Sequence, residues 1–270
     1  MRHVHRSGGA RHGQDIRGGA GPGGQVTTAG HASAPYLRRD VQEALGPTLR
    51  PGGSASTERA LALWPLPAGA RVLDIGCGLG ATVRLLRERY KLRAYGLDLT
   101  PELLIQAQNE QRDAGLLCGS AASIPLRGAV LDAVFMECVL SLCPDPAAAL
   151  AEAARVLRPG GVLVLSDVYR RDPGFAGGPN ASGCLRGAAT RYDLHARIDA
   201  AGLSVLTWED HSRLLVDCAA RLAFAGVPAS AFLGSCGADG SCATSARAFG
   251  YALCLAEKSI TISDTSVGNA

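Results

Sequence analysis

From about residue 71 onward, short continuous runs of apolar residues alternate with longer stretches in which apolar residues recur every three or four positions. The short runs predict strands buried on both faces, as in a parallel sheet covered by helices. The longer stretches predict amphipathic helices that provide this cover. A regular alternation of the two predicts an α/β fold with a mostly parallel sheet.

The pattern predicts seven strands in a single large domain. Strands are expected at residues 71–75, 92–97, 115–118, 130–136, 162–167, 203–208 and 248–256, and helices at 36–49, 54–64, 81–90, 101–113, 146–157, 192–201 and 211–225. We therefore expect a domain at 34–257, with its core at 71–168 and substrate-side elements at 169–257. The Gly-, Arg- and His-rich segment 1–33 has little to bury and is expected to be disordered, and 258–270 is expected to be a polar tail.

A glycine-rich run follows the first predicted strand. Asp74 precedes Gly76, Gly78 and Gly80, and a predicted helix begins directly afterwards. Glycines allow a ligand to approach the main chain closely, but the spacing differs from the G-x-G-x-x-G pattern of dinucleotide sites. A carboxylate beside the loop would repel a pyrophosphate and would favour a cationic ligand.

This run resembles the first motif of class I methyltransferases that depend on S-adenosylmethionine (SAM), a cationic cofactor without phosphate. The turn Arg158-Pro159-Gly160-Gly161 before the fifth predicted strand is also similar to that family. The resemblance implies a Rossmann-like sheet of seven strands with helices on both faces, SAM as cofactor, and methyl transfer. It also implies that the loop contacts the methionine end of SAM through Asp74, Gly76, Cys77, Gly78 and Gly80.

Further cofactor contacts are expected at the ends of the next two predicted strands. Asp98 ends the second strand, where the two oxygens of a carboxylate can accept hydrogen bonds from both ribose hydroxyls. Leu99 is expected to pack on the adenine. Ser120 stands where the family often has an acid, so Ser120 and Ala121 are expected to hold the adenine edge more weakly.

Charge and composition exclude some partners. Residues 1–39 contain six arginines against Asp15 alone, so the rest of the chain is slightly acidic and gives no electrostatic case for nucleic acid binding. No apolar run is long enough to predict a membrane span, and no signal-peptide pattern appears, which favours the cytoplasm. Nine cysteines are many for a reducing compartment and call for packing, metal binding or chemistry as an explanation.

The cysteines separate into two groups by their predicted positions. Packing is the simplest role for those in the glycine run, the strands and the apolar helix face, namely Cys77, Cys118, Cys218 and Cys254. The others lie in predicted loops or at strand ends on the active-site side: Cys138, Cys143, Cys184, Cys236 and Cys242. In the family, the end of the fourth strand faces the methyl group. The resemblance therefore implies Glu137 and Cys138 as candidate catalytic residues, and Glu137 also as a cofactor contact.

Two stretches resemble arsenite methyltransferases. Residues 138–145 are similar to the segment after their fourth strand, and residues 166–169 with 184–188 to their strand-five exit and substrate-cysteine loop. In that family, cysteine thiolates hold trivalent arsenic while its lone pair attacks the methyl group. The resemblance implies Cys184 as the first metalloid ligand and Cys138 as the next, although this chain has no cysteine before Asp74. The spacing of Cys236 and Cys242 fits no zinc or C-x-x-C motif; the pair could bind metalloid, form a disulfide or be incidental.

Three functions remain open on the sequence. The first is methyl transfer to thiol-bound arsenic or a related metalloid, with a thiol reductant as partner. The second is methyl transfer to a small organic acceptor, such as a quinone, at carbon, oxygen or sulfur. The third is a SAM- or thiol-binding redox or metal-handling module without catalysis. His195 and His211 could serve as bases but are more typical of surface helix residues, and the oligomeric state is not predicted.

Overall fold

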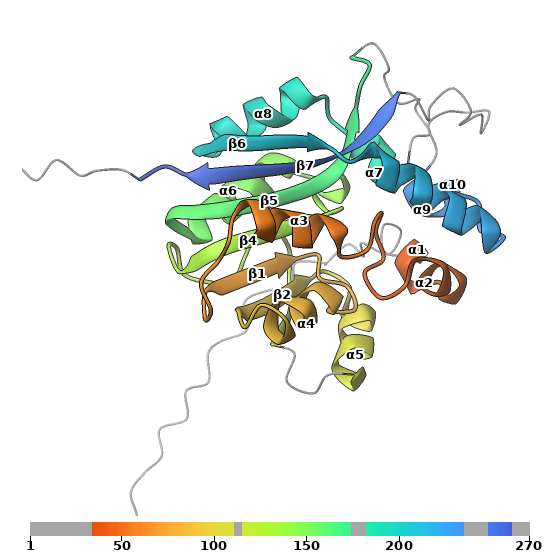
Figure 1. The fold of residues 1–270 in the computed structure, drawn as a ribbon, viewed down its shortest axis with the longest axis horizontal. Helices are drawn as coiled ribbons and strands as arrows, with labels where there is room; N and C mark the ends of the chain where they lie inside the picture. The colour runs from red at the N-terminus through yellow and green to blue at the C-terminus, as the bar shows by residue number, and fades with distance from the viewer. Residues whose placement is uncertain (1–33, 111–114, 174–181, 235–247, 261–270) are drawn as a thin grey trace, which may run out of the picture.

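The computed structural model describes residues 34–110, 115–173, 182–234 and 248–260. Its centre is a seven-stranded sheet in the order β3-β2-β1-β4-β5-β7-β6 (Figure 1). β1 to β5 are parallel to one another, and β7 runs antiparallel to both of its neighbours. The predicted mostly parallel Rossmann-like sheet is therefore confirmed.

The strands are β1 (Arg71–Ile75), β2 (Arg93–Asp98), β3 (Leu116–Cys118), β4 (Leu131–Glu137), β5 (Leu157–Arg170), β6 (Leu203–Asp210) and β7 (Phe249–Lys258). The helices are α1 (Ala34–Leu37), α2 (Arg39–Leu45), α3 (Ala55–Leu63), α4 (Ala81–Glu88), α5 (Pro101–Glu110), α6 (Pro146–Val156), α7 (Gly183–Gly187), α8 (Arg191–Ala200), α9 (Ser212–Phe224) and α10 (Ser230–Leu233), with the 3-10 turn η1 (Leu140–Leu142).

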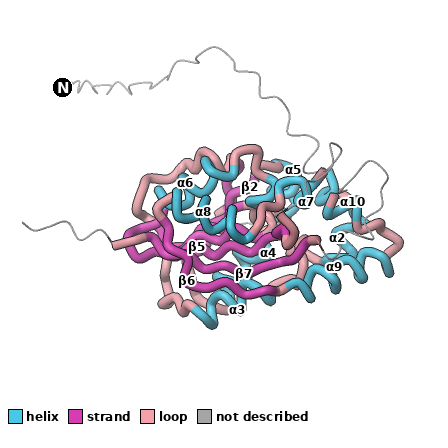
Figure 2. Tube along the Cα trace, turned by 90° about the horizontal axis from the view of Figure 1, so that it is seen from above, coloured by secondary structure: helices cyan, strands magenta, loops and turns pink. Residues whose placement is uncertain are grey.

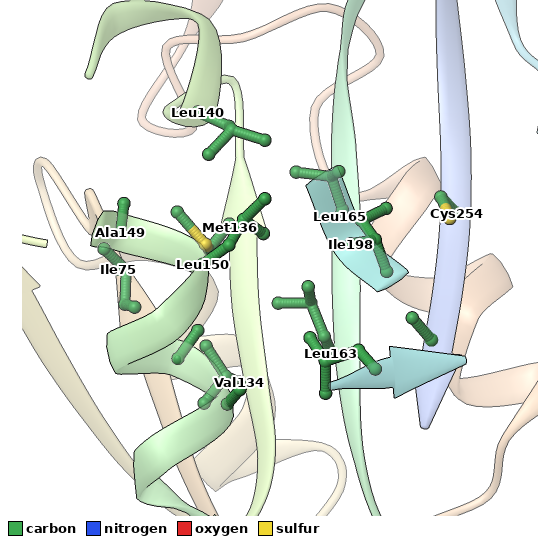
Figure 3. Close-up of a cluster of buried hydrophobic side chains, with 14 of the residues drawn as sticks. Ile75, Val134, Met136, Leu140, Ala149, Leu150, Leu163, Leu165, Ile198 and Cys254 are labelled. Carbon is green, nitrogen blue, oxygen red and sulfur yellow. The ribbon is translucent and has the colours of Figure 1, made fainter. Parts of the chain in front are cut away.

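Both faces of the sheet are buried, because helices cover each of them. Alternate residues of the central strands point to opposite faces and so join two different cores. On β4, Val134 and Met136 join the core beneath α6 and α8, and Ala133 and Phe135 join the core beneath α3 and α4. Figure 3 shows the first of these cores, where apolar side chains of the strands meet α6 and α8. This two-sided burial explains why the strand sequences are continuously apolar.

A third apolar cluster lies beyond the carboxyl ends of the central strands. It contains residues of α2, α7, α9 and α10 packed against the ends of β4, β5 and β7. Figures 1 and 2 show α2, α9 and α10 gathered at this one end of the sheet. The N-terminal helices and the substrate-side helices therefore cover the same end.

Several predicted boundaries were wrong for local reasons. The helix predicted over 36–49 is divided into α1 and α2 and ends at Leu45, because Gly46 takes a positive φ of 73° and Pro47 follows. β5 begins at Leu157 and runs to Arg170, where the sequence predicted a turn and then a loop, because its two ends pair with β4 and β7.

Two segments predicted to be irregular contain regular structure. α7 lies within the predicted loop 168–189, and Lys258, expected in the tail, ends β7 and donates from Nζ to the carbonyls of Ala154 and Leu157 at 2.7 and 2.8 Å. The segments 1–33 and 261–270 lie outside the described residues, and the domain limits stay predictions. None of the helices in the described ranges is long and apolar enough to cross a membrane.

Candidate active site

A pocket opens where β1, β2 and β4 end, beneath the segment that follows α2. Its floor is the glycine run. Gly76 has a φ of 72°, and its N–H donates to the carbonyl of Leu97 at 2.6 Å, which joins the ends of β1 and β2. A Cβ at Gly76 would overlap the side chain of Val139. Glycine is thus required here both by the backbone angle and by the close approach of a second loop.

Asp98 reaches this floor from the end of β2. Its Oδ2 accepts a hydrogen bond from the N–H of Gly78 and its Oδ1 from the N–H of Thr100, both at 2.8 Å. These bonds fix the carboxylate at the pocket wall and use one acceptor position on each oxygen. Each oxygen keeps a second lone pair, so the carboxylate can still accept from two hydroxyl groups.

The predicted adenine contacts lie on the adjoining wall. Leu99, Ser120 and Ala121 all line the pocket, and Leu99 is 55% exposed, which leaves its side chain available to a ligand. The hydroxyl of Ser120 accepts from the N–H of Ala122 at 3.2 Å and keeps its own proton to donate. This wall offers an apolar surface and one hydroxyl for a flat ring.

Two predicted loop contacts lie outside the pocket lining. Gly80 is the N-cap of α4, with a φ of 73°, and a Cβ there would face Ala107 and Leu116 rather than the pocket. Asp74 is buried, and burial together with the nearby Glu137 carboxylate raises its pKa well above the usual range. Their contacts with a cofactor stay predictions.

Arg50 is a pocket residue that the sequence analysis missed. It is only 6% exposed, and its guanidinium donates to the Thr82 hydroxyl at 2.9 Å, to the Thr57 hydroxyl at 2.7 Å, and pairs with Glu137 Oε2 at 2.9 Å. In the described part of the chain, Arg50 Nε is a buried donor without a partner. Arg50 falls in the connection between the helices predicted at 36–49 and 54–64, and no local pattern shows that an arginine in such a connection is buried.

Glu137 and Cys138 line the pocket at the end of β4, as predicted. The Glu137 carboxylate also accepts from Thr57 at 2.9 Å. Cys138 has a φ of 60°, a backbone conformation that few residues other than glycine adopt. Such an outlier at a pocket wall is held there by the surrounding structure and is more frequent at functional sites.

The structure divides the other cysteines by their access to the pocket. Cys143 lines it, and burial raises the pKa of its thiol to about 11. Cys77 contributes to the lining. Its sulfur packs closely on Gly96, because a Cβ added to Gly96 would lie only 2.6 Å from Cys77 Sγ. Cys184 lies behind the wall, buried in the third apolar cluster, and donates its S–H to the carbonyl of Leu233 at 3.2 Å.

The described residues contain no group of three His, Cys, Asp or Glu side chains that could hold a metal ion. Cys236 and Cys242 lie outside the described residues, and the roles predicted for them and for Cys184 stay predictions. No histidine is among the described residues that line the pocket; His211 instead contacts Glu209, with 3.0 Å between Nε2 and Oε2.

These groups match the chemistry of SAM. A carboxylate with free lone pairs suits a ribose diol, and an orphaned buried guanidinium N–H suits the carboxylate of a methionine half. The Glu137 carboxylate lines the same pocket as Gly76 and Gly78 and suits a sulfonium cation. The residues present therefore fit the cofactor that the sequence implies.

Comparisons with known proteins agree with this fit. Residues 73–165 match the family model described as "Methyltransferase domain". The chain is similar to malonyl-[acyl-carrier protein] O-methyltransferase from Serratia marcescens, with 42% identity over 40% of this chain and 42% of that protein. It is also similar to arsenite methyltransferase from Halobacterium salinarum, with 30% identity over 51% of this chain and 38% of that protein.

Among solved structures, the [4+2]-cyclase SpnF is similar, with 27% identity, a TM-score of 0.60, and coverage of 76% of this chain and 80% of that one. The matches to the two curated relatives cover less than half of those proteins. The family model covers the glycine run, Asp98, Ser120 and Glu137, and it does not include the pocket residues Tyr36 and Arg50.

Proposed function

We propose that this chain, whose residues 73–165 form a class I SAM-dependent methyltransferase domain, transfers the methyl group of SAM to a small-molecule acceptor held in the same pocket. The observation that carries the proposal is the position of the Asp98 carboxylate. The N–H groups of Gly78 and Thr100 fix it at the wall of a pocket that continues to an apolar surface. One half of such a pocket suits the cofactor and the other half suits the acceptor.

Bound SAM supplies an electrophilic methyl group, and the protein supplies position and exclusion of water. Asp98 would hold the ribose, and Leu99, Ser120 and Ala121 the adenine. Arg50 Nε would hold the carboxylate of the methionine half. The remaining wall, which includes Tyr36, Leu49, Val139 and Leu142, is apolar and would hold the acceptor.

The acceptor half favours a nucleophile that needs no strong base. Its thiol and phenol groups are Cys138, Cys143 and Tyr36, and burial raises the pKa of each. The two carboxylates beside them are engaged elsewhere: Glu137 pairs with Arg50, and Asp145 accepts from the N–H of Ala148 at 2.9 Å as the N-cap of α6. A soft or already ionised acceptor can attack a methyl group in line without general-base help. We infer an acceptor of this kind, carbon-, sulfur- or metalloid-centred.

The test is SAM binding by calorimetry together with S-adenosylhomocysteine formation across a panel of acceptors. Asp98→Asn should weaken SAM binding about tenfold or more, because one charged acceptor of the ribose hydroxyls is lost; tenfold corresponds to about 1.4 kcal/mol. Asp199→Asn, an exposed change on α8, is the matched control and should bind as the unchanged protein does. Equal binding by both variants would overturn the assigned role of Asp98, and no product with any acceptor despite tight binding would favour a non-catalytic SAM-binding module.

A second candidate acceptor is trivalent arsenic bound by thiols. Cys138 and Cys143 both line the pocket, and soft thiolates suit a soft metalloid. The similarity to an arsenite methyltransferase favours the same acceptor. A small organic acceptor such as a quinone is the alternative for the same apolar wall.

The discriminating assay supplies SAM and arsenite in excess thiol and measures methylated arsenic. If the pocket thiols bind the metalloid, Cys138→Ser and Cys143→Ser should each lower product formation at least about tenfold with SAM affinity unchanged. Cys218→Ser is the control, because that thiol is buried on α9 and outside this pocket. Cys184→Ser tests the residue that the sequence placed first; full activity of this variant would remove it from the site.

A further inference from the structure

A chain of buried hydrogen bonds connects the pocket thiol of Cys138 with the carboxylate of Glu137. Cys138 Sγ lies 3.3 Å from the Tyr251 hydroxyl, which lies 3.1 Å from Ser166 Oγ, which in turn lies 3.4 Å from Glu137 Oε1. Tyr251 and Ser166 are fully buried on β7 and β5, which pair side by side. The chain therefore crosses the sheet behind the pocket wall, away from solvent.

The direction of each bond follows from the partners. Glu137 is paired with Arg50 and can only accept, so Ser166 donates its one proton to it. Ser166 then accepts from Tyr251, and Tyr251, whose one proton is used, accepts from the S–H of Cys138. The S–H bond thus points into the sheet, and the sulfur lone pairs are left for the pocket that Cys138 lines.

Two further observations bear on this wall. Cys138 adopts its strained backbone conformation here, with its N–H bonded to the carbonyl of Ser166 at 2.7 Å. Arg50 lines the same pocket, and its Nε is a buried donor without a partner in the described residues, which points to a ligand there. Burial, the Asp167 carboxylate and the Cys184 thiol all raise the pKa of Cys138, while Arg50 and the Tyr251 hydrogen bond oppose them, so loss of its proton requires a specific acceptor.

We propose that Cys138 is the nucleophile of this pocket towards soft electrophiles, and that Tyr251 and Ser166 are its positioning residues and carry its proton to Glu137. As the sulfur forms a bond to the electrophile, the leaving group of the electrophile departs with the electron pair of the bond that held it. The S–H bond of Cys138 breaks in the same step. The proton passes to the Tyr251 oxygen, that of Tyr251 to Ser166, and that of Ser166 to Glu137 Oε1. The inference concerns the acceptor half of the pocket and does not depend on methyl transfer.

The test measures alkylation of individual cysteines by iodoacetamide in the full-length reduced protein without SAM, by mass spectrometry of peptides. Sulfur forms the new bond to carbon and iodide leaves. Tyr251→Phe and Ser166→Ala should each slow alkylation of Cys138 about tenfold or more. Ser166→Thr keeps the hydroxyl and should restore the rate.

Controls separate the relay from general disturbance of the fold. Ser56→Ala removes a buried hydroxyl that has no partner in the described residues, and it should leave the Cys138 rate unchanged. Cys143, in the same pocket, should react at one rate in every variant. If Tyr251→Phe exposes all cysteines by unfolding, the Ser166→Ala and Ser166→Thr pair decides the question.

Three results would overturn the proposal. One is the absence of Cys138 alkylation in the unchanged protein, since the sulfur would then not face the pocket. Another is a rate of Cys138 alkylation in Ser166→Ala equal to that of the unchanged protein. In that case only the hydrogen bond between Cys138 and Tyr251 would matter, and no proton would pass to Glu137 through Ser166. The third is Ser166→Thr behaving like Ser166→Ala. Because SAM is absent, none of these outcomes depends on whether the protein is a methyltransferase.

Discussion

Gly76 shows how much of the site depends on single backbone positions. Its positive φ closes the turn after β1, and the missing side chain admits Val139 from the loop after β4. The glycine loop after β1 and the loop after β4, which are distant in the sequence, therefore contact each other at the Cα atom of Gly76. Gly69 also has a positive φ, of 82°, but nothing lies within 4 Å of a Cβ placed there.

These two glycines allow a matched pair of variants. Gly69→Ala should lower the free energy of unfolding by about 1 kcal/mol, because only the backbone angle is strained. Gly76→Ala should cost roughly 2 to 4 kcal/mol, since overpacking against Val139 adds to the same strain, and should weaken SAM binding as the loop shifts. Urea denaturation and calorimetry measure both. Equal losses for the two variants would contradict the contact with Val139.

At the scale of elements, η1 depends on β5. Asp167 near the end of β5 accepts from the N–H of Ser141 at 2.9 Å and from its hydroxyl at 2.7 Å. This buried carboxylate holds the turn that brings Leu142 and Cys143 to the pocket wall. The part of the pocket wall that contains Leu142 and Cys143 is thus held in place by β5, the strand next to β4 in the sheet.

Asp167 should make stability depend on pH. Burial raises its pKa to about 6, above the usual value of about 4, although the hydrogen bonds from Ser141 and Val168 oppose this shift. The folded protein therefore binds this proton more tightly than the unfolded chain does. Its contribution is fully present below about pH 4 and is lost as the pH rises through about 6.

Urea denaturation between pH 4 and 7 can isolate this contribution by comparison with Asp167→Asn, which cannot titrate. The free energy of unfolding of the unchanged protein should fall relative to that of the variant by up to about 3 kcal/mol over this range. A difference that stays constant, or that grows in the opposite direction, would contradict the raised pKa.

Across the whole molecule, a buried ion pair joins the segment after α2 to the sheet. Arg50 follows α2 and pairs with Glu137 at the end of β4, and both side chains are nearly inaccessible. α2 in turn contributes Val41 and Leu45 to the apolar cluster that includes α9 and α10. The cover of the pocket is therefore connected both to the end of β4 and to helices α9 and α10.

Removal of one partner of this pair should be costly, because it leaves a buried charge unpaired. Arg50→Met should lower the free energy of unfolding by about 3 to 5 kcal/mol, and Arg50→Met with Glu137→Gln should recover part of the loss. Arg39→Met is the control: its pair with Glu43 is exposed, and the loss should stay below about 1 kcal/mol. Urea denaturation decides, and a loss for Arg50→Met as small as that of the control would contradict the buried pair.

Sequence reasoning was most reliable where the signal is local. The apolar runs predicted all seven strands, because burial on both faces forces each strand to be continuously apolar. The glycine run and Asp98 could be placed together because consecutive parallel strands of such a sheet end at the same edge. Boundaries were wrong where the limits depend on pairing, as at both ends of β5.

By itself, therefore, the sequence determined the sheet, the glycine loop and the place of Asp98 beside that loop, since periodicity and strand order fix these features. Only the tertiary structure decided that Arg50 pairs with Glu137, that Cys143 rather than Cys184 lines the pocket with Cys138, and that Tyr251 contacts Cys138. Each of these depends on which side chains meet from segments far apart in the chain. Such contacts are set by the packing of helices and strand ends against one another, and they cannot be predicted from the spacing of residues within a segment.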